Sequence, residues 1–438
     1  MKQFFCSRWR SVRLASLFHE NTVKNEDFLL SNALQFRYGS IVQKKKFDLT
    51  SDLIETYKKY TLIQPGDIMI NGLNLNYDFI TQRVALVPST GIITSAYICL
   101  RPRNSVNYRF YTYYLKALDA LKVFNGLGTG IRLTLSYDSI KNMVLPLPPR
   151  EEQDQIVRYL DWQVSKINRL IAAKRKQIAL LHEQHKRRIS EAVLHGNDDG
   201  CCQKDSGVEW IGMIPEHWSV IRCKYVFTER DERSIVGEEE HLSMSQKYGL
   251  VPDSKLDERR MLSESYVGGK VCYKNDLVLN RLKAHLGVFA LSPQKGVISP
   301  DYTVLIPNAE RILPTYGEAV LKNDLCRREL RIRVRGIIEG FWRLYTDDFN
   351  TIVIPLPPLK EQEQIMKHLS ALNNKFTALK QRLEQEINIL HELRTRLISD
   401  VVTGQIDVRG IKVPDDEYIN NEITEEEFEE ESENNEEE

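Results

Sequence analysis

Apolar positions in two stretches of the chain recur every three or four residues, as they do in amphipathic helices. The stripes consist of Leu160, Ile167, Ile171, Ile178 and Leu181 in residues 149–196, and of Leu369, Phe376, Leu379, Leu383 and Leu390 in residues 358–404. In the second stretch the pattern lasts about four heptads, which is typical of a coiled coil. Each predicted helix is about 65 Å long at 1.5 Å per residue, and its apolar stripe needs a cover. The other helix, packed antiparallel, is the simplest cover; helices of a partner protein are the alternative.

Both predicted helices begin directly after the same proline-rich junction. Leu145-Pro-Leu-Pro-Pro is repeated as Ile354-Pro-Leu-Pro-Pro, 209 positions later. Proline fixes its own φ and keeps the preceding residue extended, so each junction is a stiff strand-to-helix elbow. One elbow alone is an ordinary connection, but its recurrence indicates a long internal repeat.

The offset of 209 holds far from the elbows. It relates Trp9 to Trp218 and Asp67 to Asp276, and it slips by a few residues between Ser95 and Ser299 before it recovers. Short β-type runs and a helical pattern at 108–123 predict a mixed α/β unit. The predicted fold is α+β, with two homologous units joined by two long antiparallel coiled-coil helices and related by a pseudo-twofold axis. The predicted order is domain 1 (1–148), helix (149–196), linker (197–207), domain 2 (208–357), helix (358–404) and a disordered acidic tail (405–438).

The net charge of −1 hides a strong asymmetry. Residues 411–438 contain fourteen acidic residues and one lysine, a balance of −13, so residues 1–410 carry about +12. A basic body suits a polyanionic partner such as nucleic acid, although solvated lysines and arginines would give the same count.

Several classes of protein are disfavoured by what the sequence lacks. The seven cysteines are odd in number and have no CxxC spacing, which argues against a disulfide framework or a zinc site and favours a reducing compartment. No apolar run is long enough for a signal peptide or a membrane span, so we expect a cytoplasmic protein. Phosphate-loop, HExxH and GxSxG motifs are absent and the histidines are scattered, so we expect no catalytic residue and no metal site.

Together, the two elbows with their helices, the segment Gly207–Trp218 and the segment Ser245–Pro252 resemble the specificity subunit of type I restriction–modification systems, over nearly the whole chain. The first domain departs from the pattern, because it lacks the counterpart of the Gly207–Trp218 opening and keeps only Trp9.

The resemblance implies two target-recognition domains, each of which reads one half of a bipartite site in double-stranded DNA. It also implies that the helices set the spacer between the half-sites and dock two methyltransferase subunits. S-adenosylmethionine, Mg and ATP are then expected on the methyltransferase and nuclease/translocase subunits, and no cofactor is expected on this chain.

Polar segments at equivalent places in the two domains are the candidate DNA contacts. Asn and Gln can bond adenine bidentately, Arg can bond guanine, and Lys neutralises phosphate. In domain 1 the candidates are Ser31, Gln35, Arg37, Tyr38, Lys44, Lys45, Lys46, Asn71, Asn74 and Arg83. In domain 2 they are Ser243, Ser245, Gln246, Lys247, Tyr248, Arg281, Lys283 and His285. Arg331, Arg333 and Arg335 alternate at period two and are consistent with a strand facing phosphate or with solvent exposure.

Two alternatives stay open. One is the specificity subunit of a related two-subunit system that cuts on both sides of its site, which only the partner proteins would distinguish. The other is a coiled-coil scaffold without DNA readout, which would not need two divergent globular repeats.

Overall fold

The computed structural model describes residues 6–37, 39–44, 49–75, 82–103, 106–130, 133–197, 200–245, 248–255, 266–336 and 342–414. The described chain forms two compact units. Unit 1 combines the residues up to Lys174 with those from Glu384 onward, and unit 2 consists of Arg175–Leu383. No helix in the described ranges has the length and apolarity to cross a bilayer.

Helix α5 (Arg150–His195) and helix α9 (Leu359–Val402) each contribute one half to each unit. In unit 1 the first half of α5 packs on the second half of α9, where Lys174 Nζ lies 2.5 Å from Glu386 Oε2 and Arg394 Nη1 donates to Asn168 Oδ1 at 2.8 Å. In unit 2 the other halves meet, and the His185 ring stacks on Phe376 with centroids 4.1 Å apart. Each half is therefore covered by an antiparallel half of the other helix.

Burial along the helix stripes follows the predicted pattern with one exception. Leu160, Ile171 and Leu369 are buried, whereas Leu379 is 39% exposed. The assignment of Leu379 to the packed seam is wrong, because two helices cover only a narrow stripe of each other and leave its margins open to solvent. Ile387, which the pattern missed, is buried in the seam region.

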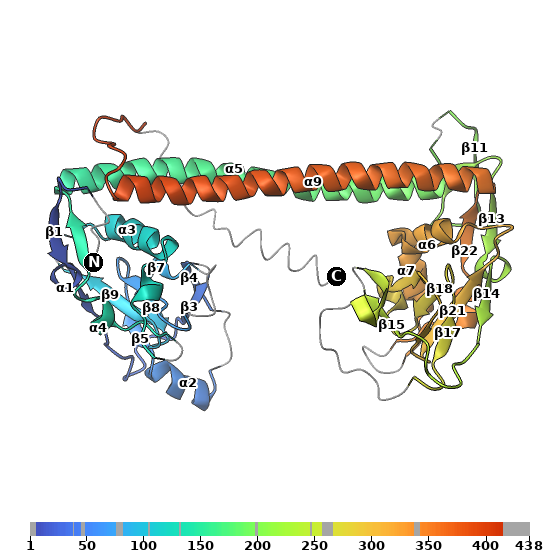
Figure 1. The fold of residues 1–438 in the computed structure, drawn as a ribbon, viewed down its shortest axis with the longest axis horizontal. Coiled ribbons are helices and arrows are strands. Elements are labelled where there is room, and N and C mark those ends of the chain that lie inside the picture. The colour runs from blue at the N-terminus through green and yellow to red at the C-terminus, as the bar shows by residue number, and fades with distance from the viewer. Residues whose placement is uncertain are drawn as a thin grey trace. The chain divides into compact units, whose positions relative to one another are not determined.

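Unit 1 is built on a four-stranded antiparallel sheet in the order β2-β9-β6-β7, with the pairs β1–β10, β3–β4 and β5–β8 around it (Figure 1). Its strands are β1 (Arg10–Arg13), β2 (Phe18–Glu20), β3 (Leu34–Arg37), β4 (Ser40–Gln43), β5 (Thr61–Ile63), β6 (Ile68–Ile70), β7 (Val84–Leu86), β8 (Gly91–Ile93), β9 (Ile98–Pro102) and β10 (Val144–Leu147). Its shorter helices are α1 (Leu14–Leu17), α2 (Ser51–Lys58), α3 (Tyr108–Ala120), η1 (Phe124–Gly126) and α4 (Tyr137–Ile140).

The two faces of this sheet bury different cores. Side chains alternate along a strand, so Ile68 and Ile70 join the core under α3 while Met69 joins the core on the opposite face. Helix α3 begins where the Asn107 side chain accepts from the amides of Arg109 and Phe110, an N-cap that fixes its start.

Unit 2 repeats this plan with the sheet order β14-β21-β18-β19. Its strands are β11 (Gln203–Asp205), β12 (Met213–Pro215), β13 (Ser219–Arg222), β14 (Phe227–Arg230), β15 (Leu242–Ser245), β16 (Gly249–Pro252), β17 (Lys270–Cys272), β18 (Leu277–Asn280), β19 (Phe289–Leu291), β20 (Gly296–Ile298), β21 (Tyr302–Pro307) and β22 (Val353–Leu356). Its shorter helices are η2 (Cys223–Tyr225), η3 (Asp253–Lys255), η4 (Ala284–Leu286), α6 (Pro314–Lys322), α7 (Asp324–Arg333) and α8 (Thr346–Asn350). The predicted α+β class with a twofold internal repeat is confirmed.

The offset between the repeats slips where two connections differ in length. Residues 71–83 join β6 to β7 in unit 1, whereas the shorter segment 281–288 joins β18 to β19 in unit 2. Unit 2 then gains helix α7 before α8, and the offset returns to 209 at the second elbow. The divergence between the units is therefore concentrated in loops rather than in the sheet.

Two predicted boundaries need correction. Part of the linker 197–207 is a strand, because β11 pairs with β12 in antiparallel register. Residues 405–414 belong to the fold of unit 1, where Val408 is buried in the core and Gln155 Nε2 donates to the carbonyls of Val408 and Ile411 at 3.0 and 2.7 Å. Residues 415–438 lie outside the described part of the chain.

The segment after α9 packs on unit 1 as the segment after α5 packs on unit 2. Gly404 and Gly196 both have positive φ at the helix ends, and a Cβ on either would lie 2.9 Å from the Trp9 ring or 3.2 Å from the Trp218 ring, respectively. Only glycine accommodates both the left-handed backbone and the close ring. The opening that the N-terminal sequence lacks is thus replaced by the C-terminal segment.

Candidate nucleic-acid interface

The polar segments predicted to contact DNA fall on equivalent β-hairpins. In unit 1 the hairpin is β3–β4, and in unit 2 it is β15–β16. Inward residues such as Leu34 and Leu242 join the core, so their neighbours Gln35 and Ser243 lie on the other face of each hairpin. Both turns include a glycine with positive φ, Gly39 and Gly249.

The hairpin lies beside β7 in unit 1 and beside β19 in unit 2. A Cβ on Gly39 would lie 2.6 Å from the Gln82 side chain, just before β7, and a Cβ on Gly249 would lie 3.1 Å from Ala290 Cβ in β19. The structure thus brings the hairpin and the loop after β6 or β18 to one edge of each unit. We call the two edges the recognition edges.

The loops after β6 and β18 begin in the same way. The Asn71 side-chain oxygen accepts from the Leu73 amide at 3.1 Å, and the Asn280 oxygen accepts from the Leu282 amide at 3.1 Å. This turn uses the acceptor of each side chain and leaves the Asn71 amide group with two hydrogens for other acceptors. Further along, Asn74 is exposed, with a positive φ of 51°.

Arg83 supports the loop from inside. It is 2% exposed, and its guanidinium donates to the carbonyls of Asn71, Leu73 and Asn74 at 3.1, 2.7 and 3.3 Å. A guanidinium engaged in this way is not presented to a base. We therefore assign Arg83 to the support of the loop, in place of the DNA contact that the sequence suggested.

Ser243 is also held by its own unit. Its hydroxyl donates to Asp253 Oδ1 at 2.6 Å, and His241 Nδ1 lies 2.6 Å from the other oxygen of that carboxylate. Ser245 accepts from the Tyr248 amide at 3.3 Å, which shapes the hairpin turn, and Tyr248 itself is 68% exposed. Among the described residues of this turn, Tyr248 is therefore more exposed than the two serines.

Helix α7 was missed by the sequence pattern. Arg331 and Arg333 lie on α7 rather than on a strand, and the buried residues of this helix, Cys326 and Leu330, are one helical turn apart. Arg333 pairs with Glu329 at 2.5 Å, and Arg335 forms an ion pair with Asp348. Arg328 and Arg331 are exposed, and their spacing of three residues on a helix is the signal that could have identified them.

This basic helix packs beside the loop after β18. A Cβ on Gly287 would lie 3.0 Å from Arg327, which places α7 against η4. Arg281 Nε donates to the Asp301 carbonyl at 2.7 Å. Lys283 is exposed, and its Nζ has no hydrogen-bond or ion-pair partner among the described residues. Lys283, Arg328 and Arg331 are thus exposed cations on two neighbouring elements of unit 2, the start of η4 and α7, and we call them its basic surface.

The remaining candidates are only partly described. Ser31 is exposed, while Gln35, Arg37 and Lys44 are half-buried. Tyr38, Lys45, Lys46, Gln246 and Lys247 lie outside the described residues, and the side chain of His285 is not described. Across the described ranges, no group of three or more His, Cys, Asp or Glu side chains could hold a metal ion.

The long helices carry a second repeated surface. The block His182-Glu183, Arg187 and Ser190-Glu191 of α5 recurs in α9 as His391-Glu392, Arg396 and Ser399-Asp400. Each copy includes an ion pair across one turn, Arg187–Glu191 at 2.7 Å and Arg396–Asp400 at 3.4 Å. We call these surfaces the helix faces. The two arginines are 80% and 82% exposed, so packing within the chain does not explain why both copies keep them.

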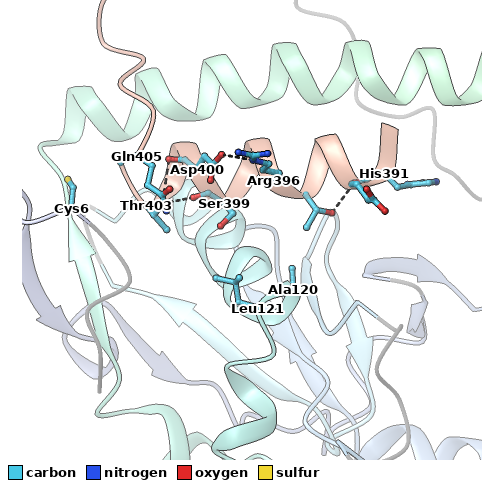
Figure 2. A pocket seen from close by; sticks show the side chains of 12 residues that line it. Cys6, Ala120, Leu121, His391, Arg396, Ser399, Asp400, Thr403 and Gln405 are labelled. Atoms are coloured by element: carbon cyan, nitrogen blue, oxygen red, sulfur yellow. Dashed lines mark hydrogen bonds and ion pairs between the residues drawn. The ribbon is translucent and has the colours of Figure 1, made fainter. Parts of the chain in front are cut away.

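The helix face of unit 1 borders a groove of about 880 Å³ (Figure 2). Ala120 and Leu121 at the end of α3 form its lower wall, and the last turns of α9 form the upper one. Leu121 is 51% exposed there. In unit 2 the Asn323 side chain, at the start of α7, donates to Ser190 at 2.8 Å, which ties α7 to the corresponding turn of α5.

Comparison with known proteins gives these features a common context. The family described as "Type I restriction modification DNA specificity domain" matches residues 7–180 and 222–388, once in each repeat and over most of the chain. The chain belongs to the specificity subunits of type I restriction–modification systems. The matched segments make units 1 and 2 its two target-recognition domains with their helices.

Relatives of similar length agree with this assignment. The type I restriction enzyme MjaVIII specificity subunit of Methanocaldococcus jannaschii is 24% identical over 420 residues, which cover 92% of this chain and 94% of the relative. The EcoKI specificity subunit of Escherichia coli strain K12 is 22% identical over 425 residues, covering 90% and 87%. A chain from a solved type I system shares the fold with a TM-score of 0.57 at 16% identity, covering 92% of this chain and 99% of that one.

Proposed function

We propose that each recognition edge binds one half of a bipartite site in double-stranded DNA. The observation that carries this proposal is the repeated pairing of a hairpin with an Asn-initiated loop at one edge of each unit. The two loops differ in length and sequence, so the same scaffold presents different surfaces, and the two half-sites should differ as well.

The chemistry of the edges suggests separate roles for their side chains. Asn71, Asn74 and Gln35 carry amides that can bond adenine in the major groove. Lys44 in unit 1, and Lys283, Arg328 and Arg331 in unit 2, suit phosphate and would provide affinity without sequence information. Arg37, Tyr248 and Arg281 belong to the same segments and are further candidate contacts. For Lys45, Lys46 and Lys247, which lie outside the described residues, the proposed phosphate contact rests on the sequence alone.

The helix faces would dock two copies of one methyltransferase subunit. Two surfaces with the same residues at the same spacing suit two copies of the same partner, because each copy meets the same pattern of charge. The exposed Leu121 and its groove offer the copy on unit 1 an additional apolar contact. The lengths of α5 and α9 would set the unread spacer between the half-sites.

In this assembly the chain provides specificity and the partners provide the chemistry. S-adenosylmethionine would bind the methyltransferase subunit, which methylates adenine at N6. Mg and ATP would serve the nuclease and translocase subunits. Histidines and carboxylates of this chain then need no role in methylation or cleavage.

The docking surface can be tested by charge reversal. R187E and R396E each reverse one charge on one helix face. In mass photometry each single variant should bind one methyltransferase copy in place of two. The double variant should bind none. R175E, on the same helix pair but outside both faces, is the matched control. Two bound copies in the double variant would contradict the assignment of the faces.

The DNA proposal is tested by mapping N6-methyladenine in a host without its own adenine methylation. Co-expression with the methyltransferase subunit should give one split motif of two unlike half-sites, and none should appear without this chain. A continuous motif would contradict the two-domain readout. Cleavage on both sides of the site would identify the related two-subunit system, and absence of DNA binding by a correctly assembled complex would favour the scaffold.

A further inference from the structure

A cysteine, a histidine and a glutamate meet at the junction of unit 2. Cys201 precedes β11, His217 follows β12, and Glu361 lies in the first turn of α9. Cys201 Sγ lies 3.8 Å from His217 Nδ1, and His217 Nε2 lies 2.8 Å from Glu361 Oε2. The thiol is also 3.5 Å from the Cys202 carbonyl. The three side chains are thus in sequential contact, with the imidazole in the middle.

The carboxylate decides which imidazole nitrogen faces the thiol. An ionised carboxylate only accepts hydrogen bonds, so His217 Nε2 carries the hydrogen that lies between it and Glu361. In the neutral ring the Nδ1 lone pair is then directed to Cys201 Sγ. This is the arrangement in which an oriented histidine takes the proton of an attacking thiol.

Unit 1 shows that packing alone does not require this arrangement. The residues equivalent to His217 and Glu361 are Arg8 and Glu152, and Arg8 Nη2 donates to Glu152 Oε1 at 2.8 Å. A hydrogen bond from the junction to a glutamate in the first turn of a long helix is therefore present in both units. An arginine cannot accept a proton, so at the described part of each junction a base beside a thiol is found in unit 2 and not in unit 1.

We propose that Cys201 is a nucleophilic thiol that exchanges with small disulfides, with His217 as its proton acceptor and Glu361 as the positioning residue. The sulfur attacks one sulfur of a disulfide R–S–S–R as His217 takes its proton. A Cys201–S–S–R bond forms, the R–S–S–R bond breaks, and the released thiolate takes up the proton as R–SH. The disulfide is the oxidant, and the reaction reverses with excess R–SH.

The position of the thiol would couple this modification to the junction. A Cβ on Gly196, directly after α5, would lie 3.4 Å from Glu361 Oε1, so the carboxylate of this α9 residue lies close to the end of α5. A group attached to Cys201 Sγ would need space beside the His217 ring, which lies 3.8 Å from that sulfur. The modified protein should therefore show faster hydrogen exchange in β11 and in the first turn of α9.

Cys202 is a built-in reference for the test. It is adjacent to Cys201 and more exposed, and among the described residues its thiol makes no hydrogen bond to the imidazole ring. We expect four of the other cysteines to react slowly, since burial raises the pKa of the Cys223, Cys272 and Cys326 thiols and that of Cys99 to about 12.

The experiment compares the full-length C202S and C201S variants with oxidised glutathione at neutral pH, by mass spectrometry of the junction peptide. We expect Cys201 to react about tenfold faster than Cys202. H217N in the C202S background should lower the rate to that of Cys202. H217R keeps an ion pair with Glu361 as in unit 1, and should be equally slow. Equal rates for the two cysteines, or an undiminished rate in H217R, would overturn the proposal, and unchanged thermal unfolding shows that each variant is folded.

Discussion

In each unit an arginine pairs with an equivalent buried aspartate, but the two arginines come from different strands. Asp67 in unit 1 and Asp276 in unit 2 occupy equivalent buried positions before the central strand of each sheet. Arg101 of β9 reaches Asp67 at 2.7 Å, whereas Arg230 of β14 reaches Asp276 at 2.9 Å. A buried carboxylate needs a cation, but the need does not specify which strand supplies it. Both units therefore neutralise the buried aspartate, although the arginines that do so are not at equivalent positions of the repeat.

The same comparison separates the scaffold from the recognition edges. Sheet order, elbows and the tryptophan under each helix end are common to both units, while the connections 71–83 and 281–288 and helix α7 are not. Divergence is thus largest where DNA contact is proposed, as expected for two domains that read different sequences on one framework.

The largest expected effect comes from removing either arginine partner. R101M or R230M leaves a buried carboxylate without its cation, which we expect to lower the free energy of unfolding of that unit by about 3 kcal/mol. Hydrogen exchange resolved by peptide measures the loss, which should stay within the mutated unit. Replacing both partners, as in D67N/R101M, should recover most of it; failure to recover would show that arginine acts through packing.

Removal of residues 405–414 should destabilise unit 1 and leave unit 2 unchanged. Truncation after Gly404 removes Val408 and the two carbonyls that Gln155 contacts, and we expect it to cost unit 1 about 2 kcal/mol. Truncation after Pro414 keeps the segment and should cost little. Equal melting temperatures for the two truncations, measured by calorimetry, would contradict the assignment of residues 405–414 to unit 1.

The basic surface of unit 2 should affect affinity without affecting sequence preference. R328A/R331A removes two proposed phosphate contacts, so binding weakens and the slope of log K against log salt falls by about two. R187A/R396A removes the same charge from the helix faces and is the control, which should leave the slope unchanged. A changed methylation motif in R328A/R331A would mean that these arginines read bases instead.

The smallest effect concerns acid. Burial, and then Lys186, Lys380 and His185, lowers the pKa of His182, which Asp324 only partly opposes. Because the folded pKa lies below that of the unfolded chain, this group contributes stability above about pH 6.5 that is lost as the pH falls further. H182Q should therefore unfold with a weaker dependence on pH between 7 and 5. An unchanged dependence would assign acid sensitivity to other groups.

The sequence predicted what periodicity and repetition determine. Helices α5 and α9 begin at Arg150 and Leu359, each within a residue of the predicted starts, because prolines and an acidic first turn mark them. Side-chain roles at the recognition edges were less predictable. Arg83 looks like a surface cation in the sequence, and only the fold shows it inside the loop that it supports.

Contacts between residues far apart in the sequence could not be predicted either. Nothing local in Ile406–Ile411 indicates that it packs on the N-terminal domain, because its partner Gln155 is some 250 positions away. Helix α7 was obscured for a different reason: three arginines at alternate positions imitate the period of a strand.

The central claim is that each unit reads one half of the DNA site, and a domain exchange tests it most directly. Residues 1–148 would be replaced by the equivalent domain of another specificity subunit, and N6-methyladenine mapped across the genome with the same methyltransferase subunit. The account predicts a motif in which one half changes while the other half and the spacer stay the same. A motif that changes in both halves, or in neither, would contradict it.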